Sequence, residues 1–224
     1  MNNKILKERK IRGMKLLRTL KKLFPGKQRT VLQYSNPLEM LIAVILSAQC
    51  TDEQVNKVTE KLFKKYRKLS DYTKVTQKEF EKDIYSTGFY RAKAKNILAM
   101  TQMLEGEFNG TVPSSMTEIT RLPGVARKTG NVVLGNVYGI TEGIAVDTHV
   151  KRFAKKFELT DSINPIQIEK DLMEIFPKKE WFTLTYYMIT YGREICTARV
   201  HDCTRHPLSK IYPRAANIWP KAKK

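Results

Sequence analysis

Apolar side chains recur at the spacing of an α-helix along almost the whole chain, and this pattern limits the folds open to it. The clearest runs are Val55, Val58, Leu62, Phe63 and Tyr66, followed by Tyr90, Ala94, Ile97, Met100 and Leu104. Residues three or four positions apart lie on one face of a helix, so each run is the buried stripe of an amphipathic helix. No segment alternates apolar and polar residues over the length of a strand. The sequence therefore predicts an all-α protein.

The helix boundaries follow from the same spacing and from capping residues. We expect helices at about 5–23, 37–48, 52–66, 76–86, 90–105, 115–121, 125–138, 148–157, 165–176 and 178–192. Asn36-Pro37 and Asn164-Pro165 each place a polar cap before a proline at the first helical position, where the missing N–H does no harm. No repeat or low-complexity linker divides the chain. Any second domain must therefore form from the two ends of the chain packing together.

Basic side chains greatly outnumber acidic ones. Lys and Arg number 41 against 22 Asp and Glu, which gives a formal net charge of +19 and a pI near 9.8. This excess exceeds what solubility requires and indicates a polyanionic partner, of which nucleic acid is the commonest. A ribosome-associated protein and a membrane-surface binder are the alternatives. The basic residues concentrate at 1–30 and 208–224, either as one stripe along DNA or as two solvated tails.

The cysteine count and the apolar runs indicate the compartment. Three cysteines, at positions 50, 196 and 203, are too few for a disulfide framework and favour a reducing compartment. We find no signal peptide, and no apolar run approaches the ~20 residues that cross a membrane. We therefore expect a cytoplasmic protein without a membrane partner. We also expect a monomer, because the predicted helices account for the apolar residues.

Residues 122–129 (LPGVARKT) form the sharpest local motif, a Pro-Gly turn between a short helix and a longer one. Gly124 permits the positive φ that such a turn needs. Backbone N–H groups at the start of the second helix would then point outward and bind a DNA phosphate without reading the bases. The alternative is a structural αα-hairpin with a glycine cap.

Lys128 and Asp147 are the candidate catalytic pair. Lys128 falls in the first turn of the second hairpin helix, where the macrodipole, Arg127 and partial burial would favour a neutral amine able to attack a sugar carbon. Asp147 follows nineteen residues later, where a short apolar segment meets the next helix. A carboxylate beside an amine nucleophile suits a glycosidic cleavage with a cationic sugar transition state. The simpler roles are a phosphate contact for Lys128 and an N-cap for Asp147.

Four segments occur in a characteristic order and spacing. They are residues 46–52 (LSAQCTD), 87–94 (TGFYRAKA), 122–129 (LPGVARKT) and 146–149 (VDTH). Together they resemble the helix-hairpin-helix superfamily of DNA glycosylases and, within it, the endonuclease III family. The resemblance extends over residues 37–201, which is most of the chain, and four blocks in register are much more specific than a hairpin alone.

The resemblance implies an all-helical fold in two lobes: a six-helix barrel at about 30–140 that includes the hairpin, and a lobe built from 1–29 and 141–224. The implied partner is double-stranded DNA with a damaged base or an abasic site, bound with the damaged nucleotide flipped out of the stack. The implied activity is removal of oxidised pyrimidines by a glycosylase with AP lyase activity. Lys128 would form a Schiff base with help from Asp147, and β-elimination would cut the strand 3′ to the abasic site. Such a protein would be associated with the nucleoid.

The resemblance also assigns DNA contacts. Gln49 would enter the gap left by the flipped base, and Phe89 would wedge into the opposite strand. Without the family match, Gln49 is better explained as a cap of its own helix and Phe89 as a core residue. The hairpin residues expected to contact DNA are Leu122, Gly124, Ala126, Arg127 and Thr129. Ala126 stands where the family has glycine, which ordinary helical φ and ψ would allow.

The chain departs from the family at its cofactor loop. The family's Cys-x6-Cys-x2-Cys-x5-Cys loop holds a [4Fe–4S] cluster, but here only Cys196 and Cys203 remain, with His206 and Tyr212 at the other two positions. Because four thiolates normally hold such a cluster, we expect none, and no cofactor in its place. Zinc bound by the two cysteines, His206 and His201 is chemically reasonable, but the spacing matches no familiar zinc pattern. Tyr212 and Trp219 would then hold the loop by packing.

Two other functions stay open at this point. The first is a mismatch or alkylated-base glycosylase on the same scaffold, since substrate choice depends on a pocket shape that a sequence does not display. The second is a non-catalytic hairpin module that binds DNA through charge and turn alone.

Overall fold

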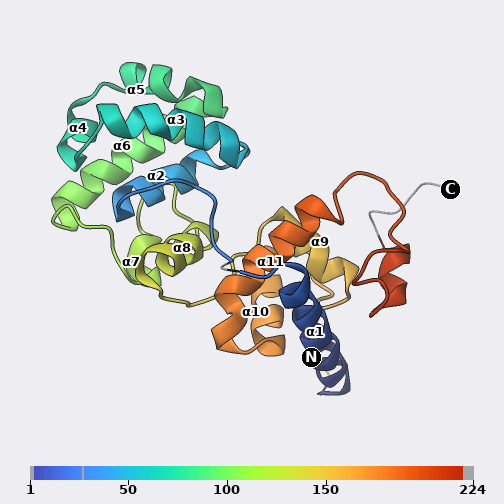
Figure 1. Cartoon of the computed structure of the whole chain (residues 1–224). Coiled ribbons are helices and arrows are strands. Elements are labelled where there is room, and N and C mark those ends of the chain that lie inside the picture. Colours follow the sequence, from blue (N-terminus) through green and yellow to red (C-terminus); the bar gives the residue numbers. More distant parts are fainter. Residues whose placement is uncertain (1–2, 27, 219–224) are drawn as a thin grey trace. The chain divides into compact units, whose positions relative to one another are not determined.

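The computed structural model describes residues 3–26 and 28–218 (Figure 1). The described residues form helices and loops without any strand, which confirms the all-α prediction. The chain divides into two units, Thr30–Glu142 and a second that combines Met1–Arg29 with Gly143–Lys224, and each has its own hydrophobic core. Within the described ranges, no helix has the length and apolarity to cross a bilayer. Trp219 lies outside the described residues.

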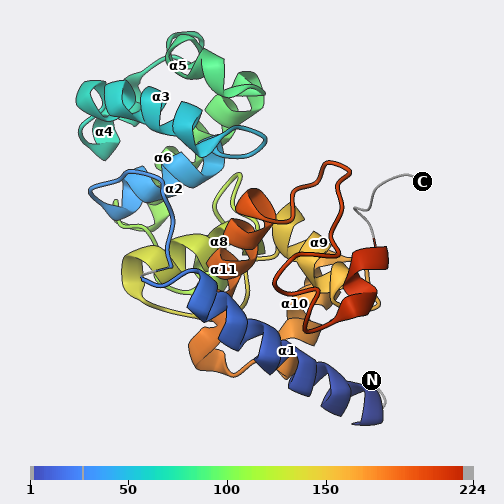
Figure 2. The ribbon, with the colours of Figure 1, turned by 45° about the vertical axis from the view of Figure 1, so that its right-hand side comes forward.

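The Thr30–Glu142 unit is built around a central apolar helix. Its elements are α2 (Pro37–Leu46), α3 (Asp52–Lys65), α4 (Leu69–Lys74), α5 (Gln77–Ile84), the 3-10 turn η1 (Tyr85–Thr87), α6 (Tyr90–Glu107), α7 (Met116–Ile119), α8 (Arg127–Val133) and the π-helical turn η2 (Leu134–Tyr138). Residues 40–46 of α2 are all buried, as expected for a helix that is apolar on every side. α2 contacts α3, α6 and α8, and Figure 2 shows these helices gathered around it.

Both predicted Asn-Pro helix starts are confirmed. The Asn36 side chain accepts a hydrogen bond from the backbone N–H of Glu39 at 2.9 Å, and α2 begins at the next residue. The Asn164 side chain accepts from the N–H of Ile166 at 2.9 Å, and α10 begins in the same way. These local capping bonds satisfy N–H groups that the helices leave free.

The other unit brings the two ends of the chain into one core. Its elements are α1 (Asn3–Leu23), α9 (Thr148–Lys156), α10 (Pro165–Ile175), the 3-10 turn η3 (Lys178–Glu180), α11 (Trp181–Glu194) and the 3-10 turn η4 (Pro213–Asn217). Figure 1 shows α1 alongside α10 and α11, which it contacts. A Cβ atom on Gly13 of α1 would lie 2.7 Å from a side-chain carbon of Ile175, so glycine allows the close approach of α1 to α10. Leu16, Leu17 and Leu20 lie on the same face of α1 as Gly13 and are also buried.

The clearest differences from the predicted helices concern α4 and residues 125–138. The short helix α4 was not expected, because it has few apolar positions and too little length to display a helical period. The single helix expected over 125–138 is instead α8 followed by η2, with Gly139 ending it at a φ of +67°. The side chain of Asn136 donates to the carbonyl of Val132 at 2.7 Å within this wider turn.

Candidate active site and nucleic-acid interface

The hairpin predicted at residues 122–129 forms between α7 and α8. Gly124 at its turn has a φ of +79°, a conformation that side chains rarely adopt. A Cβ atom there would also lie 2.9 Å from Cβ of Asn96 on α6. Leu122 and Val125 are only 2% and 5% exposed, so they anchor the turn in the core. Leu122 therefore takes part in the hairpin as an anchor, with its side chain away from solvent.

The residues after the turn are more accessible. Ala126 is the N-cap of α8 with a φ of −87° and a ψ of 169°, which is extended rather than helical backbone and suits alanine equally well. Arg127 and Lys128 are exposed and Thr129 is half-buried, so Lys128 is more accessible than expected. The first turn of α8 contains no acidic residue. The hairpin thus presents two adjacent cations, one of them the candidate nucleophile.

Asp147 has the geometry of a helix N-cap in the other unit. Its Oδ1 atom accepts a hydrogen bond from the N–H of Val150 at 2.8 Å, at the start of α9. This bond confirms the simpler role expected for Asp147, and it also holds the carboxylate in one orientation. The positive end of the α9 dipole favours a negative charge at this position. Capping and an acid–base role are compatible, because Oδ2 is not used by the cap bond.

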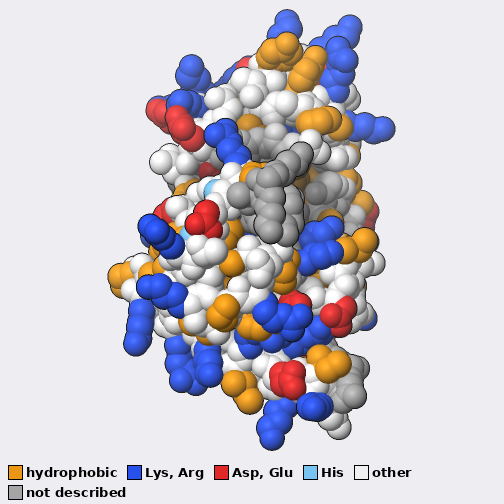
Figure 3. Space-filling view, turned by 90° about the vertical axis from the view of Figure 1, so that its right-hand side faces the viewer, with side chains coloured by type: hydrophobic (Ala, Val, Ile, Leu, Met, Phe, Trp, Pro, Cys, Tyr) orange, Lys and Arg blue, Asp and Glu red, His pale blue; other side chains and the backbone are white. Residues whose placement is uncertain are grey.

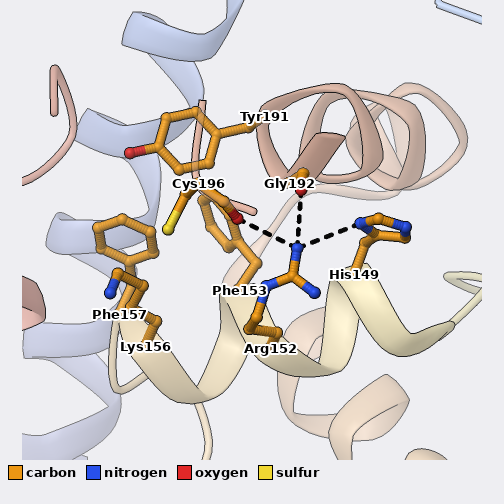
Figure 4. Close-up of a pocket in the computed structure, with 8 residues that line it drawn as sticks. All are labelled: His149, Arg152, Phe153, Lys156, Phe157, Tyr191, Gly192 and Cys196. Carbon is orange, nitrogen blue, oxygen red and sulfur yellow. Dashed lines mark hydrogen bonds between the residues drawn. The ribbon is translucent and has the colours of Figure 1, made fainter. Parts of the chain in front are cut away.

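The start of α9 is tied to α11 by a hydrogen-bond network that the sequence did not reveal (Figure 4). The Nη2 atom of Arg152 donates hydrogen bonds to the carbonyls of Gly192 at 2.8 Å and Cys196 at 3.1 Å. The same atom lies 3.3 Å from Nδ1 of His149. A Cβ atom on Gly192 would lie 2.8 Å from Nη2 of Arg152 and 2.8 Å from Nδ1 of His149, so glycine is needed for this close packing. The network fixes the helix that carries Asp147.

Gln49 and Phe89 share an unusual backbone conformation. Their φ angles are +52° and +48°, in the left-handed region that residues other than glycine rarely adopt. Both residues are exposed, and Phe89, the N-cap residue of α6, has an exposed fraction of 66%. The alternative of a core residue is therefore wrong for Phe89, and no side-chain cap bond of Gln49 is found within the described chain. Exposed loop residues with a strained backbone are typical of binding sites.

Lys93 joins the two loops that carry these residues. Its Nζ atom donates to the carbonyl of Leu46, where α2 ends, at 2.7 Å, and to the carbonyl of Thr87, where η1 ends, at 2.8 Å. The Lys93 residue is only 5% exposed. Lys93 lies in the segment 87–94 that resembles the family, but nothing in the sequence indicates that its amine is buried.

The expectation that the chain has no cofactor is wrong. Cys196, His201, Cys203 and His206 each offer one ligand atom, and these atoms all lie within 4.8 Å of one another. The spacing of these residues matches no familiar zinc motif, which is why the sequence favours loss of the metal without replacement. Folding, rather than spacing, brings the four donors together, and such a group can hold a metal ion.

Comparison with known proteins identifies the family. A model of the HhH-GPD superfamily of base excision DNA repair proteins matches residues 42–178. The chain is 45% identical over 207 residues to endonuclease III of Synechocystis sp., covering 92% of this chain and 94% of that protein. The chain belongs to the endonuclease III family. Endonuclease III of Bacillus subtilis is 44% identical over 183 residues, which cover 80% of this chain and 82% of that protein.

Solved endonuclease III structures are similar over nearly the whole length. A trapped endonuclease III–DNA covalent intermediate matches with a TM-score of 0.85 at 45% identity, covering 90% of this chain and 94% of that one. A non-covalent endonuclease III–DNA complex matches with a TM-score of 0.87 at 43% identity, covering 93% and 97%. The predicted family resemblance is thus confirmed, and with it the endonuclease III fold of this chain.

Proposed function

We propose that this chain is a base-excision-repair DNA glycosylase with AP lyase activity that acts on oxidised pyrimidines in double-stranded DNA. The observation that carries the proposal is an exposed lysine, Lys128, in the first turn after the hairpin of an endonuclease III family member. An amine at this place can reach DNA held by the hairpin, and it supplies the nucleophile that a lyase needs.

In the proposed reaction the amine of Lys128 attacks C1′ of the flipped nucleotide. The N–C1′ bond replaces the glycosidic bond, and the base leaves with the bonding electron pair and takes up a proton from solvent water. Asp147 accepts the amine proton and stabilises the cationic sugar. Opening of the sugar ring gives an imine, whose positive nitrogen acidifies C2′. Loss of a proton from C2′ expels the 3′ phosphate by β-elimination. Hydrolysis of the imine then restores Lys128.

The proposed DNA contacts combine charge with two loop residues. Figure 3 shows Lys and Arg side chains spread over the face in view, with fewer Asp and Glu side chains among them. Such a surface binds phosphates without reading sequence. Gln49 and Phe89 lie on loops joined by Lys93. We propose that the exposed Gln49 side chain fills the gap left by a flipped nucleotide and that Phe89 wedges between bases on the other strand.

Borohydride trapping on a duplex with one abasic site or one thymine glycol tests the proposal. Wild-type protein should give a covalent adduct and a strand product, and Lys128→Gln should give neither. Lys95→Gln is the matched control, because Lys95 is also an exposed helical lysine of the same unit. A wild-type protein without an adduct, or a Lys128→Gln variant that still forms one, would refute the role of Lys128.

Asp147→Asn separates the chemical role of Asp147 from its structural role. Asparagine is as good an N-cap as aspartate, so the melting temperature should hardly change. Loss of the carboxylate should slow adduct formation by about 100-fold, as expected for a general base. Equal rates for Asp147→Asn and wild type would leave Asp147 with capping alone.

A substrate panel distinguishes the competing functions. Excision of thymine glycol in preference to uracil opposite guanine and to 3-methyladenine supports the proposed substrate class, and the reverse order supports a mismatch or alkylated-base enzyme. A non-catalytic module would bind in a salt-sensitive way and give no strand product from any duplex. A cytoplasmic, nucleoid-associated location follows from the proposed substrate and is tested by imaging a fluorescent fusion.

A further inference from the structure

The donor set of the Cys196, His201, Cys203 and His206 group does not suit the family's cluster. A [4Fe–4S] cluster has four irons, each normally held by one thiolate, whereas this group has two thiols and two imidazoles. The third cysteine, Cys50, lies in the Thr30–Glu142 unit. Two sulfur and two nitrogen donors at one point instead match the tetrahedral preference of Zn²⁺.

The orientation of His201 supports a ligand role. Its Nδ1 atom lies 2.6 Å from the carbonyl oxygen of Arg199, and a carbonyl only accepts, so Nδ1 must carry the proton. The lone pair of the neutral ring is then on Nε2, which lies 3.4 Å from the Cys203 sulfur. Metal-bound histidines typically donate their other ring N–H to a carbonyl in this way.

His206 completes the nitrogen pair. Its ring stacks on that of His201 with centroids 5.0 Å apart. Its Nδ1 atom is buried and has no hydrogen-bond partner among the described residues. A buried polar atom that lacks a protein partner usually marks a water or ion site.

The sulfur atoms have polar support from α9. Lys156 is 1% exposed, and its Nζ atom donates to the Cys203 sulfur at 3.2 Å and to the carbonyl of Ile218 at 2.9 Å. The Arg152 bond to the Cys196 carbonyl holds the backbone of the other cysteine (Figure 4). The Lys156 bond would orient the Cys203 thiolate and offset its charge, whereas the Arg152 bond fixes the backbone that carries Cys196.

We propose that Cys196, His201, Cys203 and His206 bind one zinc ion, and that this zinc is structural. Zinc–sulfur and zinc–nitrogen bond lengths require ligand atoms roughly 3.3–3.8 Å apart, so the present spread of up to 4.8 Å closes by shifts on the order of 1 Å. Binding releases one proton from each cysteine thiol. With four protein ligands the ion has no open position for substrate. It joins the end of α11 to the loop that leads to η4, and this role does not depend on the proposed enzymatic activity.

Metal analysis of the whole protein, produced without a histidine tag in medium containing both zinc and iron, tests the site. We expect about one zinc per chain and little iron. Replacement of zinc by Co²⁺ should give the visible absorption bands of a tetrahedral site with thiolate charge transfer. Iron with the broad visible absorption of an iron–sulfur cluster, or a protein free of both metals, would overturn the proposal.

Cysteine variants assign the ligands. Cys203→Ser should lower zinc affinity by at least about 10-fold, the loss typical of even an outer partner. Cys50→Ser is the matched control and should keep the full zinc content. Equal zinc content in both variants would place the ion elsewhere. If Cys203→Ser does not fold, the Co²⁺ spectrum of the wild-type protein still shows whether cysteine thiolates bind the metal.

Discussion

Lys93 on α6 donates a hydrogen bond to the carbonyl oxygen of Leu46, 47 residues earlier in the chain, at 2.7 Å. The same amine donates to Thr87, so one buried cation holds the loops of Gln49 and Phe89 together. Burial lowers the pKa of Lys93, while Cys50 raises it in part. Keeping such a group inside the protein costs stability, which is expected where two strained loops must be held in place.

Lys93→Met should destabilise the protein by about 2 kcal/mol, because two carbonyls lose their donor in a buried place while the methionine fills similar space. Excision should fall more than this loss of stability explains, since both loops would loosen. Urea unfolding and excision rates measure the two effects. Lys95→Met, at an exposed position of the same helix, should change neither, and identical behaviour of the two variants would exclude a positioning role.

Phe89→Ala should weaken binding to a duplex with an abasic-site analogue by about 10-fold or more, because stacking on one base contributes about 1–3 kcal/mol. Its melting temperature should stay close to that of wild type, since residue Phe89 is 66% exposed. Ile163→Ala is the control, because residue Ile163 in the other unit is 63% exposed. Unchanged DNA affinity of Phe89→Ala would rule out the wedge.

Alanine substitutions at Gly130 and, for comparison, Gly106 test how closely the two hairpin helices pack. A Cβ atom on Gly130 of α8 would lie 2.8 Å from the Met116 sulfur and 3.2 Å from Ile119 Cγ2, both on α7. We expect Gly130→Ala to cost about 1–3 kcal/mol through overpacking. Gly106→Ala on α6, with no atom within 4 Å of the new methyl, should instead stabilise by about 0.5–1 kcal/mol. Calorimetry measures both, and a gain from Gly130→Ala would contradict the close contact of α7 with α8.

The stability of the protein should depend on pH through His149. Burial lowers its pKa below 6.5, Asp147 raises it in part, and Arg152 lowers it further. The unfolded chain therefore binds this proton more readily, so the His149 contribution to stability is complete above pH 6.5 and is lost as the pH falls through the folded pKa. His149→Gln keeps an acceptor for Arg152 and should lose less stability on acidification. An NMR titration midpoint for His149 at or above 6.5 would contradict the prediction.

Much of the architecture follows from local patterns in the sequence. The helical period, the caps at Asn36 and Asn164 and the turn at Gly124 each involve residues within a few positions of one another, so they can be read without the fold. The position of Lys128 just after the hairpin turn and of Asp147 just before the next helix also made them candidates, and the resemblance to the family agrees with both. The short helix α4 escaped prediction because six residues carry too little periodic signal.

The tertiary structure decided which polar side chains are buried and which distant residues meet. Nothing in the sequence distinguishes Lys93 and Lys156 from the chain's other basic residues, yet both are buried and bind atoms of residues 47 positions away in sequence. The four metal-ligand candidates lie between positions 196 and 206 at a spacing that matches no familiar zinc pattern, and the path of the loop after α11 brings their ligand atoms within 4.8 Å of one another. Local preferences act over about one helical turn, whereas burial and ligand convergence depend on how the whole chain packs.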